Sequence, residues 1–289
     1  MKEQLDTLIE ERARWMYRAG PLIRPVRGLL HKMLSYDSTL ALGQRVEHLP
    51  TNEVMDHMAD LIAQRVEVEG LENIPTDGPA IIVANHPTGI ADGIIMYKLL
   101  RRLRPDMFFF ANGDILRIMP QFSSMIAPVE WREDKRSMKK TRETLTYAKD
   151  AFAAGRLAVI FPAGRLSKRR GMSLHEREWM PSAAMLARKY DIPVVPIRIT
   201  ARNSLLFYLF DKLHPSLRDI TLFHEVLNKD RQQFHVRAGS AIQGGSLPKE
   251  SDAATKVLFD AVDRLRSNRH ERRLFVRRPR LVKTQPRMG

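Results

Sequence analysis

The chain has 289 residues, 44 % apolar and 28 % charged, which predicts a folded globular protein and excludes a disordered chain. Its 48 lysines and arginines exceed its 33 acidic residues, and the net charge of +15 favours anionic partners such as lipid headgroups or nucleic acid. There is no cysteine, which excludes disulfides, thiolate metal sites and a cysteine nucleophile. No apolar stretch approaches the roughly 18–20 residues of a membrane-spanning helix, so any membrane association is expected to be peripheral.

Residues 1–60 are predicted to form an N-terminal helical segment. In LIRPVRGLLHKMLSY, apolar residues recur every three or four positions between Val26 and Leu34, and Arg24, Arg27 and Lys32 fall between them. This basic amphipathic pattern suits a helix on an anionic membrane surface, and it equally suits a helix packed on the core with a solvated basic face.

From residue 65 onwards, short apolar runs alternate with helical stretches. Strands are predicted around Val66 and Val68 and at 80–84, 107–112, 126–131, 157–162, 193–200, 219–227 and 233–242. Helices are predicted at 90–103, 137–154, 181–190 and 248–267. This order predicts an α/β domain over 61–247 with a mainly parallel sheet flanked by helices, followed by a C-terminal helix and basic tail over 248–289.

A polar motif, NHPTGIADG, directly follows the predicted strand at 80–84. A carboxylate at Asp92 can orient the imidazole of His86 and stabilise its protonated form, which leaves the second ring nitrogen to take a proton from a hydroxyl. Gly89 and Gly93 permit the tight turn that would bring the two side chains together. No serine, cysteine or threonine is placed as an obvious nucleophile, so the pair predicts direct attack by a substrate hydroxyl or amine on an activated acyl group.

Two further polar motifs, EWRED and AGRLSKRRG, follow the predicted strands after residues 126–129 and 157–162. Ligands of open α/β sheets gather beyond the carboxyl ends of the strands, so all three motifs are expected at one edge. The basic residues after residue 164 suit either an anion site or an ordinary solvated loop. The histidines are scattered without the spacing of a metal site, so no metal is predicted.

Taken in order, NHPTGIADG, IAPVEWRED, IFPAGRLS and IPVVPIRI resemble the four sequence blocks of the lysophospholipid acyltransferase family, which includes the glycerophosphate and lysophosphatidate acyltransferases. The resemblance covers about residues 66–205. It implies that His86 is the general base, that Asp92 orients it, and that the block at 193–196 lines the acyl-donor side. The substrate-binding residues expected from these blocks and the basic loop are Asn85, Thr88, Gly89, Trp131, Arg132, Phe161, Pro162, Gly164, Arg165, Ser167 and Lys168.

The chain departs from the common family pattern at two positions. Five residues rather than four separate His86 from Asp92, and Ala163 stands where the FPEGTRS block has its glutamate. Both departures resemble a bacterial hemolysin-like branch whose members include acyltransferases of aminolipids. The acceptor contacts assigned to that glutamate therefore do not carry over, so the acceptor is expected to be a lysolipid or a glycerophosphate-type molecule, whereas acyl transfer itself needs only the base, its orienter and an activated thioester.

The resemblance predicts an enzyme that moves an acyl group from acyl-CoA or acyl carrier protein to the hydroxyl of a lysolipid, without a cofactor. It would act peripherally on the cytoplasmic face of an anionic membrane. The run Leu205–Phe210 is interpreted either as a core helix or as a contact with lipid or the acyl chain. The alternative is a non-catalytic basic protein that binds nucleic acid or anionic lipid through RSNRHERRLFVRRPRLVK, although no nucleic-acid-binding motif is present.

Overall fold

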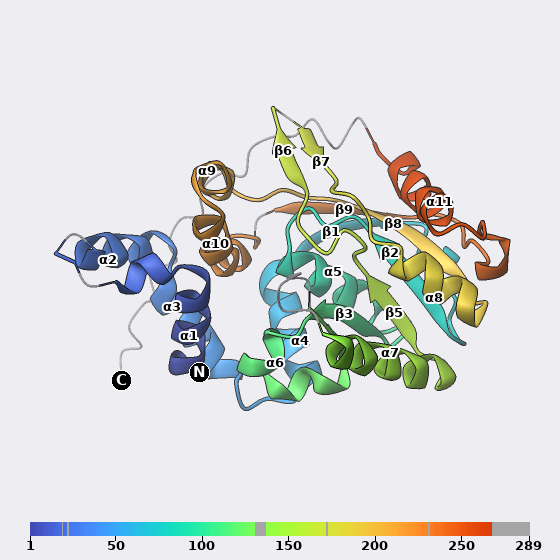
Figure 1. Cartoon of the computed structure of the whole chain (residues 1–289), viewed down its shortest axis with the longest axis horizontal. Helices are drawn as coiled ribbons and strands as arrows, with labels where there is room; N and C mark the ends of the chain where they lie inside the picture. Colours follow the sequence, from blue (N-terminus) through green and yellow to red (C-terminus); the bar gives the residue numbers. More distant parts are fainter. Residues whose placement is uncertain (19, 22, 131–136, 172, 231, 268–289) are drawn as a thin grey trace.

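The computed structural model describes residues 1–267 apart from residues 19, 22, 131–136, 172 and 231 (Figure 1). Along the chain, its helices and strands are α1 (Lys2–Arg12), α2 (Ile23–Met33), α3 (Tyr36–Val46), α4 (Thr51–Ile62), β1 (Arg65–Glu69), β2 (Ala80–Ala84), α5 (Ile90–Leu100), β3 (Phe108–Asn112), α6 (Ile115–Ile118), β4 (Ile126–Val129), α7 (Met138–Ala153), β5 (Leu157–Ile160), β6 (Lys168–Arg170), β7 (Ser173–His175), α8 (Ser182–Tyr190), β8 (Val194–Thr200), α9 (Leu205–Leu213), α10 (Pro215–Leu227), β9 (Gln233–Ala238) and α11 (Ser251–Arg264).

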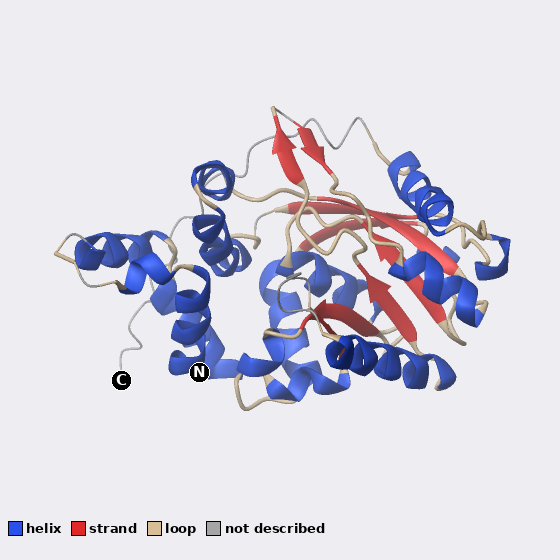
Figure 2. Ribbon diagram, in the orientation of Figure 1, coloured by secondary structure: helices blue, strands red, loops and turns tan. Residues whose placement is uncertain are grey.

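Within the described residues, one seven-stranded sheet has the strand order β1-β9-β8-β2-β5-β3-β4. Strand β2 pairs in parallel with β5 on one side and with β8 on the other. The pairing of β8 with β9 is antiparallel, and the other pairings in this sheet are parallel. The predicted α/β fold with a mainly parallel sheet is therefore confirmed, and Figure 2 shows its strands as a layer between helices.

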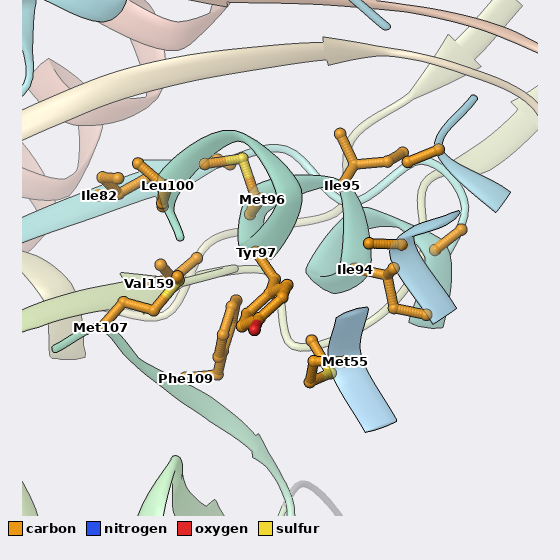
Figure 3. Close-up of a cluster of buried hydrophobic side chains, with 14 of the residues drawn as sticks. Met55, Ile82, Ile94, Ile95, Met96, Tyr97, Leu100, Met107, Phe109 and Val159 are labelled. Atoms are coloured by element: carbon orange, nitrogen blue, oxygen red, sulfur yellow. The ribbon is translucent and has the colours of Figure 1, made fainter. Parts of the chain in front are cut away.

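Helices cover both faces of the sheet, and the alternation of side chains along β2 shows how. Ile82 and Ala84 belong to the apolar cluster that includes residues of α4 and α5, whereas Ile81 and Val83 join the cluster with residues of α7, α8 and α11. Figure 3 shows the first cluster, in which Tyr97 of α5 lies beside Phe109 of β3. Strands buried on both faces read as continuous apolar runs, which explains why β2 is visible in the sequence.

The N-terminal helices and the α9–α10 pair share a smaller core of their own. Leu5 and Ile9 of α1, Leu30 of α2, Phe210 of α9 and Ile220 of α10 form one buried cluster. Figure 1 shows these helices at one end of the molecule, beside the sheet domain. None of the helices in the described part of the chain combines the length and apolar character needed to cross a bilayer.

The strand predicted at 219–227 is wrong, because these residues belong to helix α10. His214 caps this helix by accepting a hydrogen bond from the Ser216 N–H, and Pro215 occupies its first turn. The β-branched residues of DITLFHEVL favour a strand locally, but burial of Ile220 and Val226 against other helices decides the structure. The other predicted strands and helices are observed with shifts at their ends, while the β6–β7 hairpin was not predicted.

Candidate active site

The predicted catalytic pair lies at the connection between β2 and α5. His86 stands two residues beyond the end of β2, and Asp92 lies in the first turn of α5. His86 Nδ1 is 2.9 Å from Asp92 Oδ2, although the ring N–H is not aligned for a linear hydrogen bond. The Asp92 side chain is fully buried, while 18 % of the His86 side chain remains exposed. A buried carboxylate thus faces one nitrogen of an imidazole that is partly exposed to solvent.

Asp92 also organises the loop that connects it to His86. Its Oδ2 accepts hydrogen bonds from the backbone N–H groups of Thr88 at 2.8 Å and Gly89 at 2.9 Å, and its Oδ1 accepts one from the Thr88 hydroxyl. Gly89 adopts φ +85° and ψ −123°, a conformation that other residues rarely reach. The five-residue spacing therefore closes into a turn that brings both side chains together.

The segment after β5 forms a second side of the site. The Phe161 ring stacks on the His86 ring with centroids 4.4 Å apart. The Ser167 N–H donates to the His86 carbonyl at 2.9 Å. Between them the chain turns at Gly164, whose φ is +58°. These contacts confirm that the first and third sequence blocks meet at the carboxyl edge of the sheet.

Asn85 and Pro162 are engaged within the protein. The Asn85 amide donates to the Ile199 carbonyl at 2.8 Å and accepts from the Ile199 N–H at 2.7 Å, so the side chain joins β2 to β8 as a further rung of the ladder. The Pro162 carbonyl accepts a hydrogen bond from the Met180 N–H at 2.9 Å. Both residues hold the frame of the site in this structure.

The basic loop projects from this edge as the β6–β7 hairpin (Figure 1). Arg165 and Lys168 are exposed, and the Arg169 guanidinium lies over the Tyr208 ring of α9, 5.0 Å from its centroid. Trp131 and Arg132 lie outside the described residues, as does the basic tail 268–289. Within the described part, no group of three or more histidine, aspartate or glutamate side chains is arranged to hold a metal ion.

Two further features near the pair were not predicted from the sequence. Glu176 follows β7, and its Oε2 accepts a hydrogen bond from the His86 backbone N–H at 3.2 Å. Lys229 and Glu225 form a fully buried ion pair with Nζ and Oε2 2.8 Å apart. Burial disfavours the charged form of Glu225, but the Lys229 ammonium and the Ser204 donors outweigh burial and hold the pKa of Glu225 below its ordinary value.

The i, i+4 spacing of Glu225 and Lys229 was the available signal for their ion pair, but it is visible only once 219–227 is read as a helix. For Glu176, no comparable signal is present, because the strands on either side of Gly171 have three residues each and are largely polar. The sequence therefore does not identify His86 as the partner of Glu176.

Comparisons with known proteins indicate the class of enzyme to which this site corresponds. A family model described as Acyltransferase matches residues 65–200. The chain is 26 % identical over 214 residues to a lyso-glycine lipid O-acyltransferase of Phocaeicola vulgatus, covering 72 % of this chain and 75 % of that protein. A lyso-glycine lipid O-acyltransferase of Bacteroides thetaiotaomicron is 24 % identical over 205 residues, covering 71 % and 72 %.

Among solved structures, the 1-acyl-sn-glycerophosphate (LPA) acyltransferase PlsC of Thermotoga maritima is similar with a TM-score of 0.47 and 16 % identity, covering 83 % of this chain and 95 % of that one. The family match and the curated relatives define an acyltransferase. The family-model match and these relatives support the resemblance to the lysophospholipid acyltransferase family that the sequence blocks carry.

Proposed function

We propose that this enzyme transfers an acyl group from acyl-CoA or acyl carrier protein to the hydroxyl of a lysolipid, with His86 as the general base. The observation that carries the proposal is the 2.9 Å approach of His86 Nδ1 to the buried Asp92 carboxylate at the end of β2. With Nδ1 facing Asp92, Nε2 is the ring nitrogen left to take a proton.

In the proposed reaction, the acceptor hydroxyl attacks the thioester carbonyl carbon while His86 Nε2 removes the hydroxyl proton. The C–O bond forms and the carbonyl oxygen becomes an oxyanion. When the oxyanion collapses, the C–S bond breaks and the thiolate takes the proton from His86. The products are an ester and a free thiol, and general-base assistance of this kind contributes typically about 10²–10⁴-fold.

Asp92 supports this cycle in two ways. Its negative charge stabilises the imidazolium that exists between proton removal and proton return. Its hydrogen bonds to the Thr88 and Gly89 N–H groups fix the loop that carries His86. Since these bonds occupy the same oxygen that faces His86, the carboxylate is held in place before substrate arrives.

For the acceptor, we favour a lysolipid whose headgroup is an amino acid. Ala163 takes the place of the third-block glutamate, which weighs against the common glycerophosphate acceptor. The two curated relatives described above are lyso-glycine lipid O-acyltransferases. The exposed Arg165 and Lys168 offer cationic groups that suit a carboxylate or a phosphate.

We further propose that the enzyme binds the cytoplasmic face of an anionic membrane through its helical end. Leu205, Leu209 and Leu213 of α9 are 57 %, 52 % and 63 % exposed, and they recur at four-residue spacing on one face of the helix. Val26, Leu29 and Met33 of α2 are 43 %, 58 % and 41 % exposed, and basic residues flank them. Exposed apolar side chains beside basic ones are typical of helices that lie in a membrane interface.

The catalytic proposal is tested with the full chain, acyl-CoA or acyl carrier protein as donor, and a panel of lysophospholipids and N-(3-hydroxyacyl) amino acids, with thiol release and product mass as readouts. His86→Ala is expected to lose about 10²–10⁴-fold in turnover. His175→Ala, which alters an exposed histidine of β7, is the matched control and should retain wild-type turnover. Normal turnover in folded His86→Ala would contradict the general-base role.

The membrane proposal is tested by sedimentation with vesicles of phosphatidylcholine and phosphatidylglycerol. Leu209→Gln with Leu213→Gln removes two exposed leucines, each of which contributes on the order of 1.5 kcal/mol when buried in apolar surroundings. The double variant should therefore bind about 10²-fold more weakly. Leu145→Gln, at an exposed leucine of α7, is the control and should bind as the wild type does. Equal binding by all three proteins would refute the role of α9.

A further inference from the structure

The Glu176 carboxylate contacts the active-site loop from a segment that the reaction above does not use. Its Oε2 accepts hydrogen bonds from the His86 backbone N–H at 3.2 Å and from the Ser167 hydroxyl at 3.0 Å. Ser167 in turn donates its backbone N–H to the His86 carbonyl at 2.9 Å. The peptide groups on both sides of the His86 Cα are therefore held, one by Glu176 and one by Ser167.

The segment that carries Glu176 is itself fixed along the 162–167 loop. The Arg177 Nε–H donates to the Leu166 carbonyl at 2.9 Å, and the Met180 N–H donates to the Pro162 carbonyl at 2.9 Å. Trp179 is buried with its ring edge-on to Phe259 of α11. These contacts fix the chain directly after Glu176 and so limit the movement of its carboxylate.

Stability alone does not account for this carboxylate. Burial raises the pKa of Glu176, and the hydrogen bonds from the His86 N–H and the Ser167 hydroxyl offset only part of that rise. Its second oxygen, Oε1, is buried without a hydrogen-bond partner among the described residues. A partly buried carboxyl group with one buried oxygen left without a hydrogen bond costs folding free energy. Groups retained at such a cost concentrate at functional sites.

We propose that Glu176 is a positioning residue for acyl transfer, which fixes the backbone of His86 so that the imidazole stays between Asp92 and Phe161. The third sequence block has Ala163 in place of its common glutamate, and the β6–β7 hairpin supplies a carboxylate to the site from elsewhere in the chain. This inference rests on the proposed role of His86, and it assigns Glu176 no contact with the reacting atoms.

Two conservative variants of Glu176 separate the position of its hydrogen-bond-accepting oxygen from its negative charge. Glu176→Gln keeps an acceptor oxygen at the same reach but removes the charge. Glu176→Asp keeps the charge but withdraws the carboxylate by one C–C bond, about 1.5 Å. A misplacement of about 1 Å in a catalytic group can cost about 10²-fold in rate. Glu176→Asp should therefore lose about 10²-fold in kcat with an unchanged KM for the lysolipid, whereas Glu176→Gln should stay near wild type.

The experiment measures kcat and KM of the full-length variants, together with the hydrogen-exchange rate of the His86 amide. Glu178→Gln, at an exposed acidic residue of the same segment, is the matched control. Faster exchange at His86 and a lower kcat in Glu176→Asp, with both restored in Glu176→Gln, would support the proposal. Wild-type kcat in Glu176→Asp, equal losses in both variants, or a change confined to KM would overturn it.

The two proposals fail in different ways. If the wild-type enzyme transfers acyl groups and Glu176→Asp matches it, only the inference about Glu176 fails. If the wild type is inactive on every acceptor, the proposed function fails, and the exchange rate of the His86 amide alone decides the positioning role. Unchanged exchange in Glu176→Asp would then refute it.

Discussion

Replacing Asp92 with asparagine removes the negative charge behind the base while leaving the loop intact. Oδ2 accepts the N–H groups of Thr88 and Gly89 and faces His86 Nδ1, while Oδ1 contacts only the Thr88 hydroxyl among the described residues. An asparagine can place its carbonyl oxygen at the Oδ2 position and its NH₂ group at the hydroxyl, which both donates and accepts. The backbone contacts of the loop therefore survive the substitution.

The expected loss of kcat in Asp92→Asn follows from the contact between Asp92 and His86. His86 Nδ1 lies 2.9 Å from Asp92 Oδ2, and the carboxylate is fully buried. With charge centres about 4 Å apart and an effective dielectric constant of about 20, the carboxylate stabilises the imidazolium by about 4 kcal/mol. If this stabilisation is lost in the transition state, kcat of Asp92→Asn should fall by about 10³-fold.

The assay is the initial rate of thiol release at saturating lysolipid, with thermal unfolding measured in parallel. Asp150→Asn, at an exposed aspartate of α7, is the matched control and should keep wild-type kcat. Because the charge acts on the imidazolium, KM should change little. A folded Asp92→Asn enzyme with more than about a tenth of the wild-type kcat would refute the electrostatic reasoning.

Three further predictions concern stability. Lys229→Met removes the cation beside the buried Glu225 carboxylate and should lower the free energy of urea unfolding by about 3–5 kcal/mol. The double variant Lys229→Met with Glu225→Gln should recover part of this loss. A loss under about 1 kcal/mol in Lys229→Met would contradict a stabilising role of the pair. Gly89→Ala forces a residue with a Cβ into φ +85°, with that Cβ 3.3 Å from a Leu166 methyl, and should cost about 1–3 kcal/mol; an unchanged melting temperature would count against it. Because burial raises the pKa of Glu176, the folded state resists its ionisation, so the stability of the wild type should fall relative to that of Glu176→Gln as pH rises above about 4.3. Urea unfolding from pH 4 to pH 8 measures this, with Glu178→Gln as control. A difference in unfolding free energy between wild type and Glu176→Gln that stays constant with pH would contradict it.

The elements that could be predicted are those whose local pattern and tertiary environment agree. Strand β2 is a continuous apolar run because both of its faces are covered. Helix α10 shows the opposite case, since its β-branched residues favour a strand locally and burial among other helices overrides that preference. The β6–β7 hairpin escaped prediction because its two strands have three residues each and consist largely of polar side chains.

In the site, too, contacts within a short stretch of sequence could be predicted, and contacts between distant segments could not. His86 and Asp92 lie close together in the sequence, at the end of the β2–α5 loop and in the first turn of α5, so their spacing and the glycine between them were enough to predict that they meet. Asn85 was predicted to bind substrate, yet its amide pairs with the backbone of Ile199, more than a hundred positions away. The contact between Glu176 and His86 spans 90 positions, and only the path of the chain through the hairpin creates it.

The sequence by itself determined most of the alternation of strands and helices, the family-like blocks and the approach of His86 to Asp92, because each of these depends on a short-range pattern of residue types. Only the tertiary structure decided which carboxylate holds the His86 backbone, which backbone pairs with the Asn85 amide, and which leucines of α9 stay exposed. These outcomes depend on side chains that approach one another through the packing of distant segments. Local spacing carries no record of such contacts.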